Sequence, residues 1–292
     1  MRPPDEVELS RPDKLLWPDA GVTKAAYRRY LDAVAERMLP WLRRRPLTVI
    51  RAPDGVAGER YFQKAASSYM PAWIDTVEIP APSAKRDVRY VVCDHRQALE
   101  WLGNQAAVEF HPAPVRVDRL DRPDWLVFDV DPPQDRFDQA VAVAELVLEE
   151  LDALGLSAGV KTTGGKGLHV FVPIERRYAT PQLRAAAAAL TARVAAREPD
   201  LVTDEFRKAD RGGRVMLDPS RNAPGSTVVA VYSPRARDGA TVSFPLTPGE
   251  LATARPERFT ISTAPAFLDG AGPRAWDELA GRRFRLPAAL LA

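Results

Sequence analysis

Apolar residues recur at helical spacing from residue 24 to residue 42 and form one stripe: Tyr27, Leu31, Val34, Met38 and Leu42. This spacing predicts an amphipathic helix that packs on a core, with Thr23 as its N-cap. The chain that follows predicts three short strands, at residues 47–51, 61–64 and 88–93, and then a second helix at residues 97–108. Together these elements predict a first lobe of mixed helix and strand.

From Trp125 onward the pattern alternates between strands and helices. Apolar runs predict five strands, at residues 125–131, 158–162, 168–173, 215–218 and 227–232. Residues 137–154 predict a helix that is closed by Gly155. Residues 181–197 predict another helix, with Thr180 as its N-cap and Pro181 in its first position. This part of the chain is therefore expected to be an α+β sheet layered with helices.

The composition indicates a globular protein with a sizeable core, since 46% of its 292 residues are hydrophobic and 27% are charged. No apolar run approaches the roughly 18 residues that a membrane-spanning helix needs. The first residues contain no apolar stretch, so no signal or transit peptide is expected and a cytoplasmic location is predicted. A single cysteine, Cys93, excludes an internal disulfide framework and a cysteine-rich zinc site.

The formal net charge of +2 does not by itself indicate a nucleic-acid partner. The distribution of charge is more informative than the total. Basic residues gather at residues 43–45 and 207–214, and acidic residues gather at residues 129–135. Taken alone, each of these clusters is equally typical of a solvated face.

Two aspartates stand two residues apart at the end of the apolar run Trp125-Leu-Val-Phe-Asp-Val-Asp131. Strand alternation places Asp129 and Asp131 on one face, where two like charges are unfavourable unless a cation neutralises them. Oxygen ligands suit magnesium or manganese, and paired ions stabilise the attacking and leaving oxygens of a phosphoryl displacement. Solvated aspartates at a strand end are the alternative. Glycosyltransferases and haloacid dehalogenase phosphatases also place Asp-x-Asp after an apolar strand, although Pro132-Pro133 departs from the phosphatase pattern.

A glycine-rich segment, Lys161-Thr-Thr-Gly-Gly-Lys-Gly-Leu-His-Val170, joins two predicted strands. Its glycines allow the backbone to approach a ligand closely and Lys166 adds a positive charge, so the segment suits a triphosphate. It is not a Walker A loop, because Gly167 rather than Ser or Thr follows the lysine. A plain turn is the alternative for the glycines. His169 is a candidate either for a phosphate contact or for a hydrogen-bonded core position.

A third segment, Arg211-Gly-Gly-Arg-Val-Met-Leu-Asp218, again ends a short apolar strand with an aspartate. Basic residues surround this aspartate in the sequence, among them Arg221 and, further along, Arg235. An acid among bases fits a metal ligand beside phosphate contacts. Because a single aspartate at a strand end is commonly a turn residue, Asp218 is assigned to the site only together with the earlier pair.

Taken in this order, the three segments resemble the polymerase domain of bacterial ligase D, which belongs to the archaeo-eukaryotic primase superfamily. Asn222 and the segment Tyr232-Ser-Pro-Arg-Ala-Arg237 extend the match, which runs from Leu9 to about Pro245. The resemblance implies an α+β, two-lobed primase-polymerase fold, with an RRM-like catalytic sheet, flanking helices and a smaller N-terminal lobe. Residues 1–292 are then one domain, with the N-terminal lobe at about residues 1–115 and the catalytic lobe at about residues 116–292.

The same resemblance assigns roles to residues of the site. It implies that Asp129, Asp131 and Asp218 are the catalytic residues and hold two metal ions, manganese or magnesium. It implies contacts with the incoming nucleotide from six residues: Thr163, Lys166, His169, Arg235, His111 and Arg211. Thr163 stands where the family usually has serine, a change that keeps the hydroxyl. The implied activity is template-dependent nucleotidyl transfer that extends 3′ ends at gaps or breaks, as in non-homologous end joining.

The resemblance also implies DNA contacts from five residues: Lys14, Lys24, Tyr61, Phe62 and Lys64. Lys14 and Lys24 match a pair that holds a 5′-phosphate, although Arg11 replaces an asparagine that is usual three residues before Lys14. Tyr61 and Phe62 match an aromatic pair that stacks on the template strand. Without the resemblance, ordinary surface lysines and alternating strand residues would explain these positions.

The implied partners are a gapped or broken duplex with a 5′-phosphate and a ribo- or deoxyribonucleoside triphosphate, which places the protein at the nucleoid. The sequence lacks the Lys-x-Asp-Gly motif of ligase adenylation, so a stand-alone or excised domain is expected, with Ku protein and a DNA ligase acting in trans. Two alternatives remain open, an Asp-x-Asp phosphohydrolase and a catalytically inactive nucleic-acid-binding module. Phosphate release without primer extension distinguishes the first, and three intact aspartates argue against the second.

Overall fold

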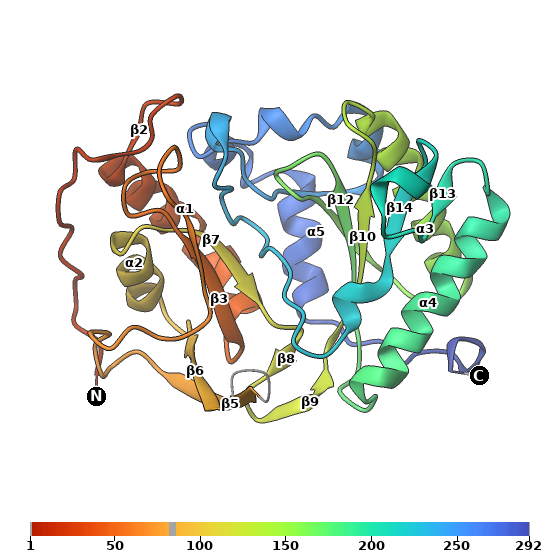
Figure 1. The fold of residues 1–292 in the computed structure, drawn as a ribbon, viewed down its shortest axis with the longest axis horizontal. Coiled ribbons are helices and arrows are strands. Elements are labelled where there is room, and N and C mark those ends of the chain that lie inside the picture. Colours follow the sequence, from red (N-terminus) through yellow and green to blue (C-terminus); the bar gives the residue numbers. More distant parts are fainter. Residues whose placement is uncertain (1, 82–85, 292) are drawn as a thin grey trace. The chain divides into compact units, whose positions relative to one another are not determined.

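The computed structural model describes residues 2–81 and 86–291, and Figure 1 labels its elements. The chain divides into two units. Unit 1 consists of Met1–Asp118, Thr227–Ser243 and Glu257–Leu268. Unit 2 consists of Arg119–Ser226, Phe244–Pro256 and Asp269–Ala292. Each unit is therefore built from segments that are far apart in the sequence.

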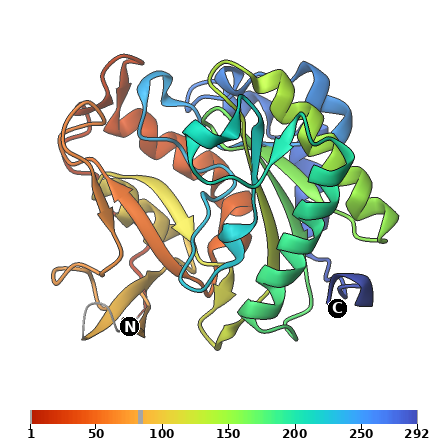
Figure 2. The ribbon, with the colours of Figure 1, turned by 45° about the vertical axis from the view of Figure 1, so that its right-hand side comes forward.

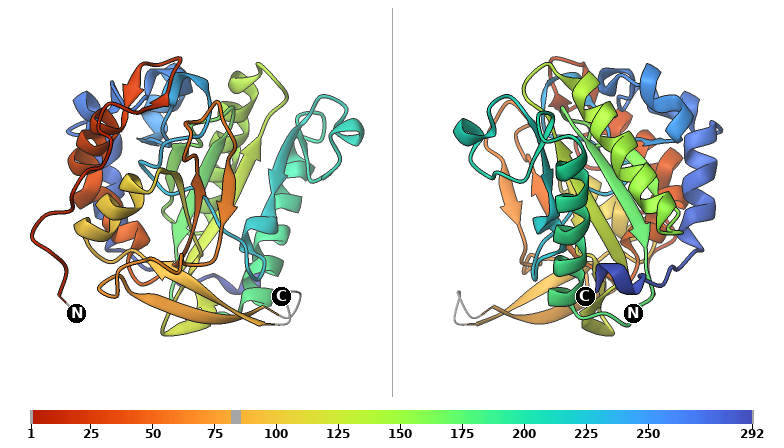
Figure 3. Two further views of the ribbon diagram at one scale, coloured as in Figure 1. Left: turned by 60° about the vertical axis from the view of Figure 1, so that its left-hand side comes forward. Right: turned by 90° about the vertical axis from the view of Figure 1, so that its right-hand side faces the viewer.

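Unit 1 combines two helices with a five-stranded sheet. The helices are α1 (Lys24–Leu42) and α2 (Arg96–Asn104), which lie side by side in the left view of Figure 3. The sheet has the order β4-β3-β6-β5 with β7 also paired to β3, and its strands are β3 (Pro46–Arg51), β4 (Tyr61–Gln63), β5 (Thr76–Ala81), β6 (Arg86–Val92) and β7 (Ala107–Pro112). The shorter strands are β1 (Leu15–Trp17), its partner β2 (Val22–Thr23), and β8 (Val115–Arg116).

The first helix confirms the prediction from the sequence. The Thr23 hydroxyl accepts a hydrogen bond from the Ala26 amide at 3.2 Å and so caps the N-terminus. Every residue of the predicted apolar stripe is at most 1% exposed: Tyr27, Leu31, Val34, Met38 and Leu42. Burial of this stripe, rather than helix propensity, supplies most of the stability of such a helix.

The second helix is shorter than the sequence predicts. α2 ends at Asn104, and Ala106 has a φ of +57°, a left-handed conformation that does not continue a helix. β7 begins at the next residue and pairs with β3, so residues 107–112 form sheet hydrogen bonds. The prediction of helix up to residue 108 is therefore wrong over its last turn, because pairing with β3 outweighs the local periodicity.

Unit 2 is organised around a six-stranded sheet with the order β13-β14-β10-β12-β11-β15. Its strands are β10 (Trp125–Asp131), β11 (Gly159–Thr162), β12 (Leu168–Pro173), β13 (Val202–Thr203), β14 (Val215–Asp218) and β15 (Pro245–Leu246). Its helices are α3 (Phe137–Ala153), α4 (Thr180–Arg197) and α5 (Ala271–Ala280), and β9 (Arg119–Pro123) precedes the sheet. In chain order, with the two-residue edge strand β13 left aside, β10, α3, β11, β12, α4 and β14 give a β-α-β-β-α-β arrangement. This confirms the predicted α+β class with an RRM-like sheet.

The two faces of this sheet have different characters. On one face β10 carries Leu126, Phe128 and Val130, which are all completely buried. The apolar stripes of α3 and α4 pack against the sheet, as the green helices of Figure 2 show. The opposite face of the same strand carries Asp129 and Asp131, because successive side chains of a strand alternate. Helices α3 and α4 therefore cover the first face, whereas the face with the aspartates also carries Phe171 of β12, whose ring lies 5.5 Å from the Trp276 ring of α5.

Two further predictions from the sequence are wrong: the N-cap of one helix and the existence of one strand. α4 includes Thr180, and its N-cap is Ala179, whose amide donates to the Gln182 side chain at 2.9 Å. Residues 227–232 do not form a strand of the second lobe; they belong to unit 1. There the amides of Val228 and Ala230 donate to carbonyls of β7, and the segment then turns where Tyr232 has a φ of +64°. The segment is apolar, as the sequence shows, but its hydrogen bonds with β7 are too irregular to form a regular strand.

Short 3-10 helices complete the chain: η2 (Lys208–Arg211), η3 (Pro219–Asn222), η4 (Asp238–Ala240), η5 (Pro248–Thr253), η6 (Pro256–Arg258), η7 (Ala264–Phe267) and η8 (Ala288–Leu290). Of these, η3 follows β14 directly and begins at the site described below. Across residues 2–81 and 86–291, we find no helix with both the length and the apolar character that a membrane span requires.

Candidate active site

Four chemically reactive side chains form one row across the sheet of unit 2. In the strand register, Asp129 of β10 lies opposite Asp218 of β14 on one side and opposite His169 of β12 on the other. His169 in turn lies opposite Lys161 of β11. Cross-strand partners project from the same face, so the row reads Asp218, Asp129, His169 and Lys161. Asp131 lies on this face one pair further along β10. The fold thus brings together the three aspartates and His169, as the sequence predicts.

Asp129 is held between a histidine and an arginine. Its Oδ1 lies 3.3 Å from His169 Nε2, and Arg221 Nε donates to its Oδ2 at 2.9 Å. Burial opposes ionisation of Asp129, but the His169 contact and the charge of Arg221 outweigh it and hold the pKa well below its usual range. Asp129 is therefore a carboxylate at neutral pH. The sequence analysis named Arg221 only as one of the basic residues around Asp218 and gave it no contact with Asp129.

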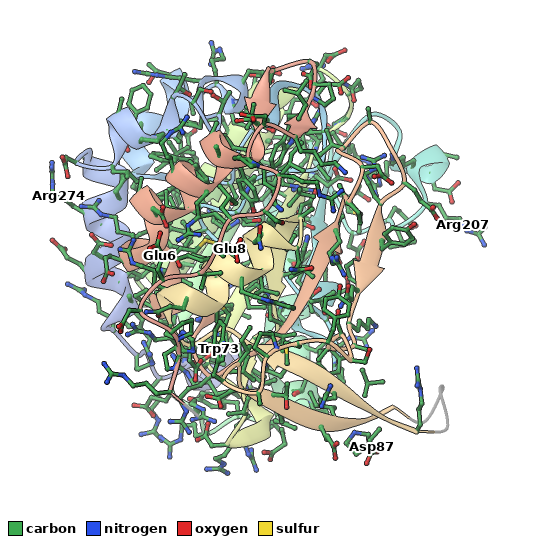
Figure 4. All side chains as sticks on the ribbon, turned by 90° about the vertical axis from the view of Figure 1, so that its left-hand side faces the viewer. Glu6, Glu8, Trp73, Asp87, Arg207 and Arg274 are labelled. Atoms are coloured by element: carbon green, nitrogen blue, oxygen red, sulfur yellow. The ribbon has the colours of Figure 1, made fainter. Side chains whose placement is uncertain are left out.

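Asp131 has two cationic partners. Lys166 Nζ lies 2.8 Å from Oδ1, and Arg211 Nη1 donates to Oδ2 at 2.8 Å. Arg211 also donates to the carbonyls of Glu205 and Phe206, each at 3.0 Å. It therefore anchors the segment between β13 and β14, where Figure 4 shows the Arg207 side chain pointing away from the ribbon. Two of the six predicted nucleotide contacts, Lys166 and Arg211, thus flank Asp131.

Asp218 combines two roles at the end of β14. Its carboxylate accepts from the Ser220 amide at 2.7 Å and from the Ser220 hydroxyl at 2.8 Å, which caps η3. Asn222, two residues after Ser220, accepts from the Val127 amide at 2.9 Å and donates to the Val127 carbonyl at 2.7 Å. Asn222 therefore continues the pairing with β10 where β14 ends, and so fixes Arg221 beside Asp129.

The glycine-rich loop is shaped by Thr163 and by the lack of a side chain at Gly167. Thr163 Oγ1 donates to the Gly167 carbonyl at 3.1 Å and accepts from the Gly165 amide at 3.1 Å. A Cβ atom at Gly167 would lie 2.2 Å from the Val130 carbonyl oxygen, so only glycine fits beside β10. This close approach places Lys166 next to Asp131. Thr163 is 9% exposed, and these contacts give it a structural role in the loop.

His169 lies between Asp129 and a buried lysine. Lys161 is fully buried, its Nζ is 2.9 Å from His169 Nδ1, and it lies 5.5 Å from the centroid of the Phe171 ring. Burial and the charge of Lys161 lower the pKa of His169 to about 4. The imidazole is therefore neutral at neutral pH. Sequence reasoning placed Lys161 in the glycine-rich segment without assigning it a role.

The donor set of unit 2 suits a hard divalent cation. Three carboxylates from two neighbouring strands share one face, and carboxylate oxygens are the ligands that magnesium and manganese prefer. In the positions that the described residues, 2–81 and 86–291, occupy here, no three His, Cys, Asp or Glu side chains are grouped to hold a metal. The aspartate oxygens instead face Arg221, Lys166, Arg211 and Ser220. Metal binding therefore requires these side chains to exchange partners.

Two predicted nucleotide contacts of unit 1, His111 and Arg235, lie beside a glutamate that the sequence did not single out. Glu109 Oε2 lies 2.8 Å from His111 Nε2 and 3.1 Å from Arg235 Nε, and its Oε1 accepts from the Ala236 amide at 2.8 Å. Burial opposes ionisation of Glu109, but the His111 hydrogen bond and the charge of Arg235 prevail and lower its pKa to about 2. One carboxylate thus fixes both predicted nucleotide contacts of this unit.

The predicted DNA contacts of unit 1 fall into two groups. The Phe62 ring is 56% exposed and lies 6.1 Å from the His111 ring, with Lys64 Nζ 5.9 Å above it. Tyr61, also exposed, donates to Glu59. This group offers an aromatic and cationic surface.

The second group holds the two lysines. Lys14 pairs with Asp54 at 3.1 Å, and Lys24 Nζ donates to the Ser10 carbonyl at 2.8 Å and to its hydroxyl at 3.0 Å. Burial, followed by the charges of Arg11 and Lys14, lowers the pKa of Lys24 to about 8. Burial is the larger cause, and the charges of Arg11 and Lys14 add to it because three basic residues lie close together here.

Comparison with known proteins agrees with this architecture. The chain matches a solved structure described as the polymerase domain from Mycobacterium tuberculosis ligase D in complex with DNA, with a TM-score of 0.86 and 30% sequence identity. The match covers 92% of this chain and 96% of that one. Fold and site therefore define a polymerase domain, an enzyme of the nucleotidyltransferase class. Residues 23–279 match the family described as the primase-polymerase domain of LigD. The chain belongs to this family.

Two relatives show how much of a longer protein the chain corresponds to. It is 33% identical over 290 residues to the multifunctional non-homologous end joining protein LigD of Pseudomonas aeruginosa, covering 97% of this chain and 34% of that protein. It is 36% identical over 255 residues to the protein of the same name from Mycolicibacterium smegmatis, covering 85% and 33%. The chain thus spans about a third of the length of these relatives.

Proposed function

We propose that this chain is a metal-dependent primase-polymerase that extends 3′ ends at gaps or breaks in DNA during non-homologous end joining. One observation carries the proposal: three carboxylates share one face of the six-stranded sheet of unit 2, and the cationic side chains of Lys166, Arg211 and Arg221 flank them. The family of the chain supports this reading, as do relatives whose names refer to non-homologous end joining. The protein would act as a single domain, with an N-terminal lobe at about residues 1–115 and a catalytic lobe at about residues 116–292.

In this proposal Asp129, Asp131 and Asp218 hold two manganese or magnesium ions. Such ions, when bound, lower the pKa of the attacking hydroxyl and offset charge on the triphosphate. Asp129 is already a carboxylate at neutral pH, because Arg221 and His169 keep its pKa low. No protein group therefore has to lose a proton there before a cation binds.

Each unit, taken by itself, holds candidate nucleotide contacts. In unit 2, Lys166 and Arg211 present cationic groups on either side of Asp131, and His169 and Thr163 lie beside the same face. In unit 1, His111 and Arg235 are held by Glu109. Guanidinium and ammonium groups are the side chains that bind phosphate oxygens most strongly. The substrate is accordingly a ribo- or deoxyribonucleoside triphosphate.

The DNA contacts lie in unit 1. Lys14 and Lys24 would receive a 5′-phosphate, and Tyr61, Phe62 and Lys64 would contact the template, since bases stack on exposed aromatic faces. The solved structure that the chain resembles is described as a complex with DNA. We further propose that the chain acts together with Ku and a DNA ligase at the nucleoid, because its relatives are named as non-homologous end joining proteins.

Primer extension tests the proposal. The substrate is a gapped duplex with a 5′-phosphate, supplied with manganese and either ribo- or deoxyribonucleotides, and wild type is compared with Asp129→Ala. Asp138→Ala is the matched control, because this aspartate is exposed at the start of α3 and pairs with Arg136. We expect extension by wild type and by the control, and loss in Asp129→Ala. No extension by wild type on any gapped or primed template would overturn the proposal, and phosphate release without extension would indicate a phosphohydrolase.

A further inference from the structure

Lys161 of β11 is the last residue in the row Asp218, Asp129, His169 and Lys161, and it lies next to His169. Its strand position is directly opposite His169, and its Nζ lies 2.9 Å from His169 Nδ1. The side chain has no exposed surface and runs past the Phe171 ring. A lysine is rarely buried completely, because moving an ammonium group out of water is unfavourable.

Packing alone does not account for a lysine here. A methionine of similar length would fill the space beside Phe171 without removing a charge from water. The polar end of Lys161 is directed at the ring nitrogen of a histidine that itself touches Asp129. The contact that distinguishes lysine from methionine is therefore the one with His169.

The two ring nitrogens of His169 face opposite kinds of neighbour. Nδ1 faces an ammonium group, which has three donors and no acceptor. Nε2 faces Asp129 Oδ1 at 3.3 Å, and an ionised carboxylate can only accept. A neutral imidazole has one donor and one acceptor nitrogen, and which one carries the hydrogen is set by the bond that the other makes. Both neighbours here select the form with the hydrogen on Nε2.

We infer that Lys161 is a positioning residue that fixes His169 as the Nε2–H tautomer, so that this nitrogen faces the reaction site only as a hydrogen-bond donor. The consequence for catalysis rests on the proposed function. A donor at this position can bind an oxygen of the triphosphate or of Asp129, whereas it cannot accept a proton. His169 therefore orients oxygen atoms by donating a hydrogen bond and does not act as a general base through Nε2.

The tautomer can be read directly by nitrogen NMR of the whole protein labelled with ¹⁵N. The chain has three histidines, His95, His111 and His169, so the ring signals are few, and His169→Gln identifies its own pair. In wild type we expect a protonated Nε2 and an unprotonated Nδ1 that accepts a hydrogen bond. A protonated Nδ1 in the wild-type protein would overturn the inference. This measurement does not depend on catalytic activity, so it stands apart from the primer-extension test.

Substitution then tests whether Lys161 is the cause. Lys161→Met keeps the length and removes the donor, and Lys208→Met, at an exposed lysine of η2, is the control. A hydrogen bond at His169 Nδ1 changes the ¹⁵N chemical shift of this nitrogen. We expect that change to disappear in Lys161→Met and to remain in Lys208→Met. An unchanged His169 spectrum in that variant would overturn the inference.

A double-mutant comparison separates positioning from general damage to the fold. Losing a partner that orients a functional histidine typically lowers activity by about 10- to 100-fold. We expect a loss of kcat/KM in this range for Lys161→Met in the wild-type background. In the His169→Gln background the same substitution should change kcat/KM little, because its target is gone. Equal losses in both backgrounds would show that Lys161 acts independently of His169 and would overturn the inference.

Discussion

The carboxylates of the two units are held in different ways. In unit 1, Glu109 accepts from the backbone amide of Ala236, its Oε2 lies 2.8 Å from His111 Nε2 and 3.1 Å from Arg235 Nε, and its side chain is 5% exposed. In unit 2, Asp129 and Asp131 are met by the long side chains of Arg221, Lys166 and Arg211, and Asp131 is 29% exposed. A backbone amide cannot move away from its acceptor, whereas a long side chain can exchange partners. The glutamate is thus built as an anchor and these two aspartates as exchangeable ligands, whereas the third aspartate, Asp218, also accepts from the backbone amide of Ser220.

The largest effect expected from this difference is on catalysis in unit 2. Asp218→Asn removes a negative charge from the sheet face but keeps the shape that caps η3. We expect primer extension to fall on the order of 10³-fold, while the free energy of unfolding changes by less than about 1 kcal/mol, because like charges repel in the wild type. Single-turnover extension and urea unfolding of the same preparation measure both. A large loss of stability would show that Asp218 is an anchor like Glu109.

The converse is expected in unit 1. Glu109→Gln keeps the size of the side chain but leaves His111 and Arg235 without their buried carboxylate. We expect the free energy of unfolding to fall by about 1–3 kcal/mol, the usual result of leaving buried partners unsatisfied. Urea unfolding with Glu78→Gln, an exposed position on β5, as the control gives the difference. If both variants are equally stable, Glu109 does not anchor this unit.

The pH dependence of stability sharpens this assignment. Burial opposes ionisation of Glu109, but His111 and Arg235 lower its pKa to about 2, below the value of about 4.3 in an unfolded chain. Ionised Glu109 therefore stabilises the fold above pH ~4.3, and this contribution is lost as the pH falls toward ~2. We expect the stability difference between wild type and Glu109→Gln to be constant from pH ~7 to ~5 and to shrink below pH ~4. A difference that stays constant down to pH ~3 would contradict the assignment.

The smallest effect is expected at the surface ion pair of unit 1. Asp54, whose side chain is 82% exposed, pairs with Lys14 at 3.1 Å, and exposed pairs contribute about 0–1 kcal/mol. Asp54→Asn should leave stability nearly unchanged and free Lys14 for a phosphate. We expect binding of a gapped duplex with a 5′-phosphate to tighten about two- to fivefold, by the same free energy. Titration of a duplex lacking this phosphate should show no change, and equal tightening on both duplexes would assign the effect to general charge.

Much of the sheet in unit 2 was predictable from the sequence. The bounds of β10, β12 and β14 agree with the predicted residues 125–131, 168–173 and 215–218. These strands are short apolar runs bounded by turn residues or charges, which is the pattern that local sequence conveys best. Residues 227–232 carry a similar pattern and form no strand, because they meet β7 of unit 1 in irregular pairing. Local pattern therefore identified buried extended chain without identifying its partner.

The sequence by itself determined which residues are candidates for chemistry: the aspartates at strand ends, the glycine-rich loop with Lys166 and His169, and the basic residues around Asp218. Only the tertiary structure decided their neighbours. Strand order places Lys161 beside His169, and η3 brings Arg221 into contact with Asp129. The spacing of these residues in the sequence predicts neither contact. The same holds for Glu109, which meets Arg235 across more than a hundred residues. The physical reason is that composition and spacing act along the chain, whereas burial and electrostatic pairing act through space between segments that the fold brings together.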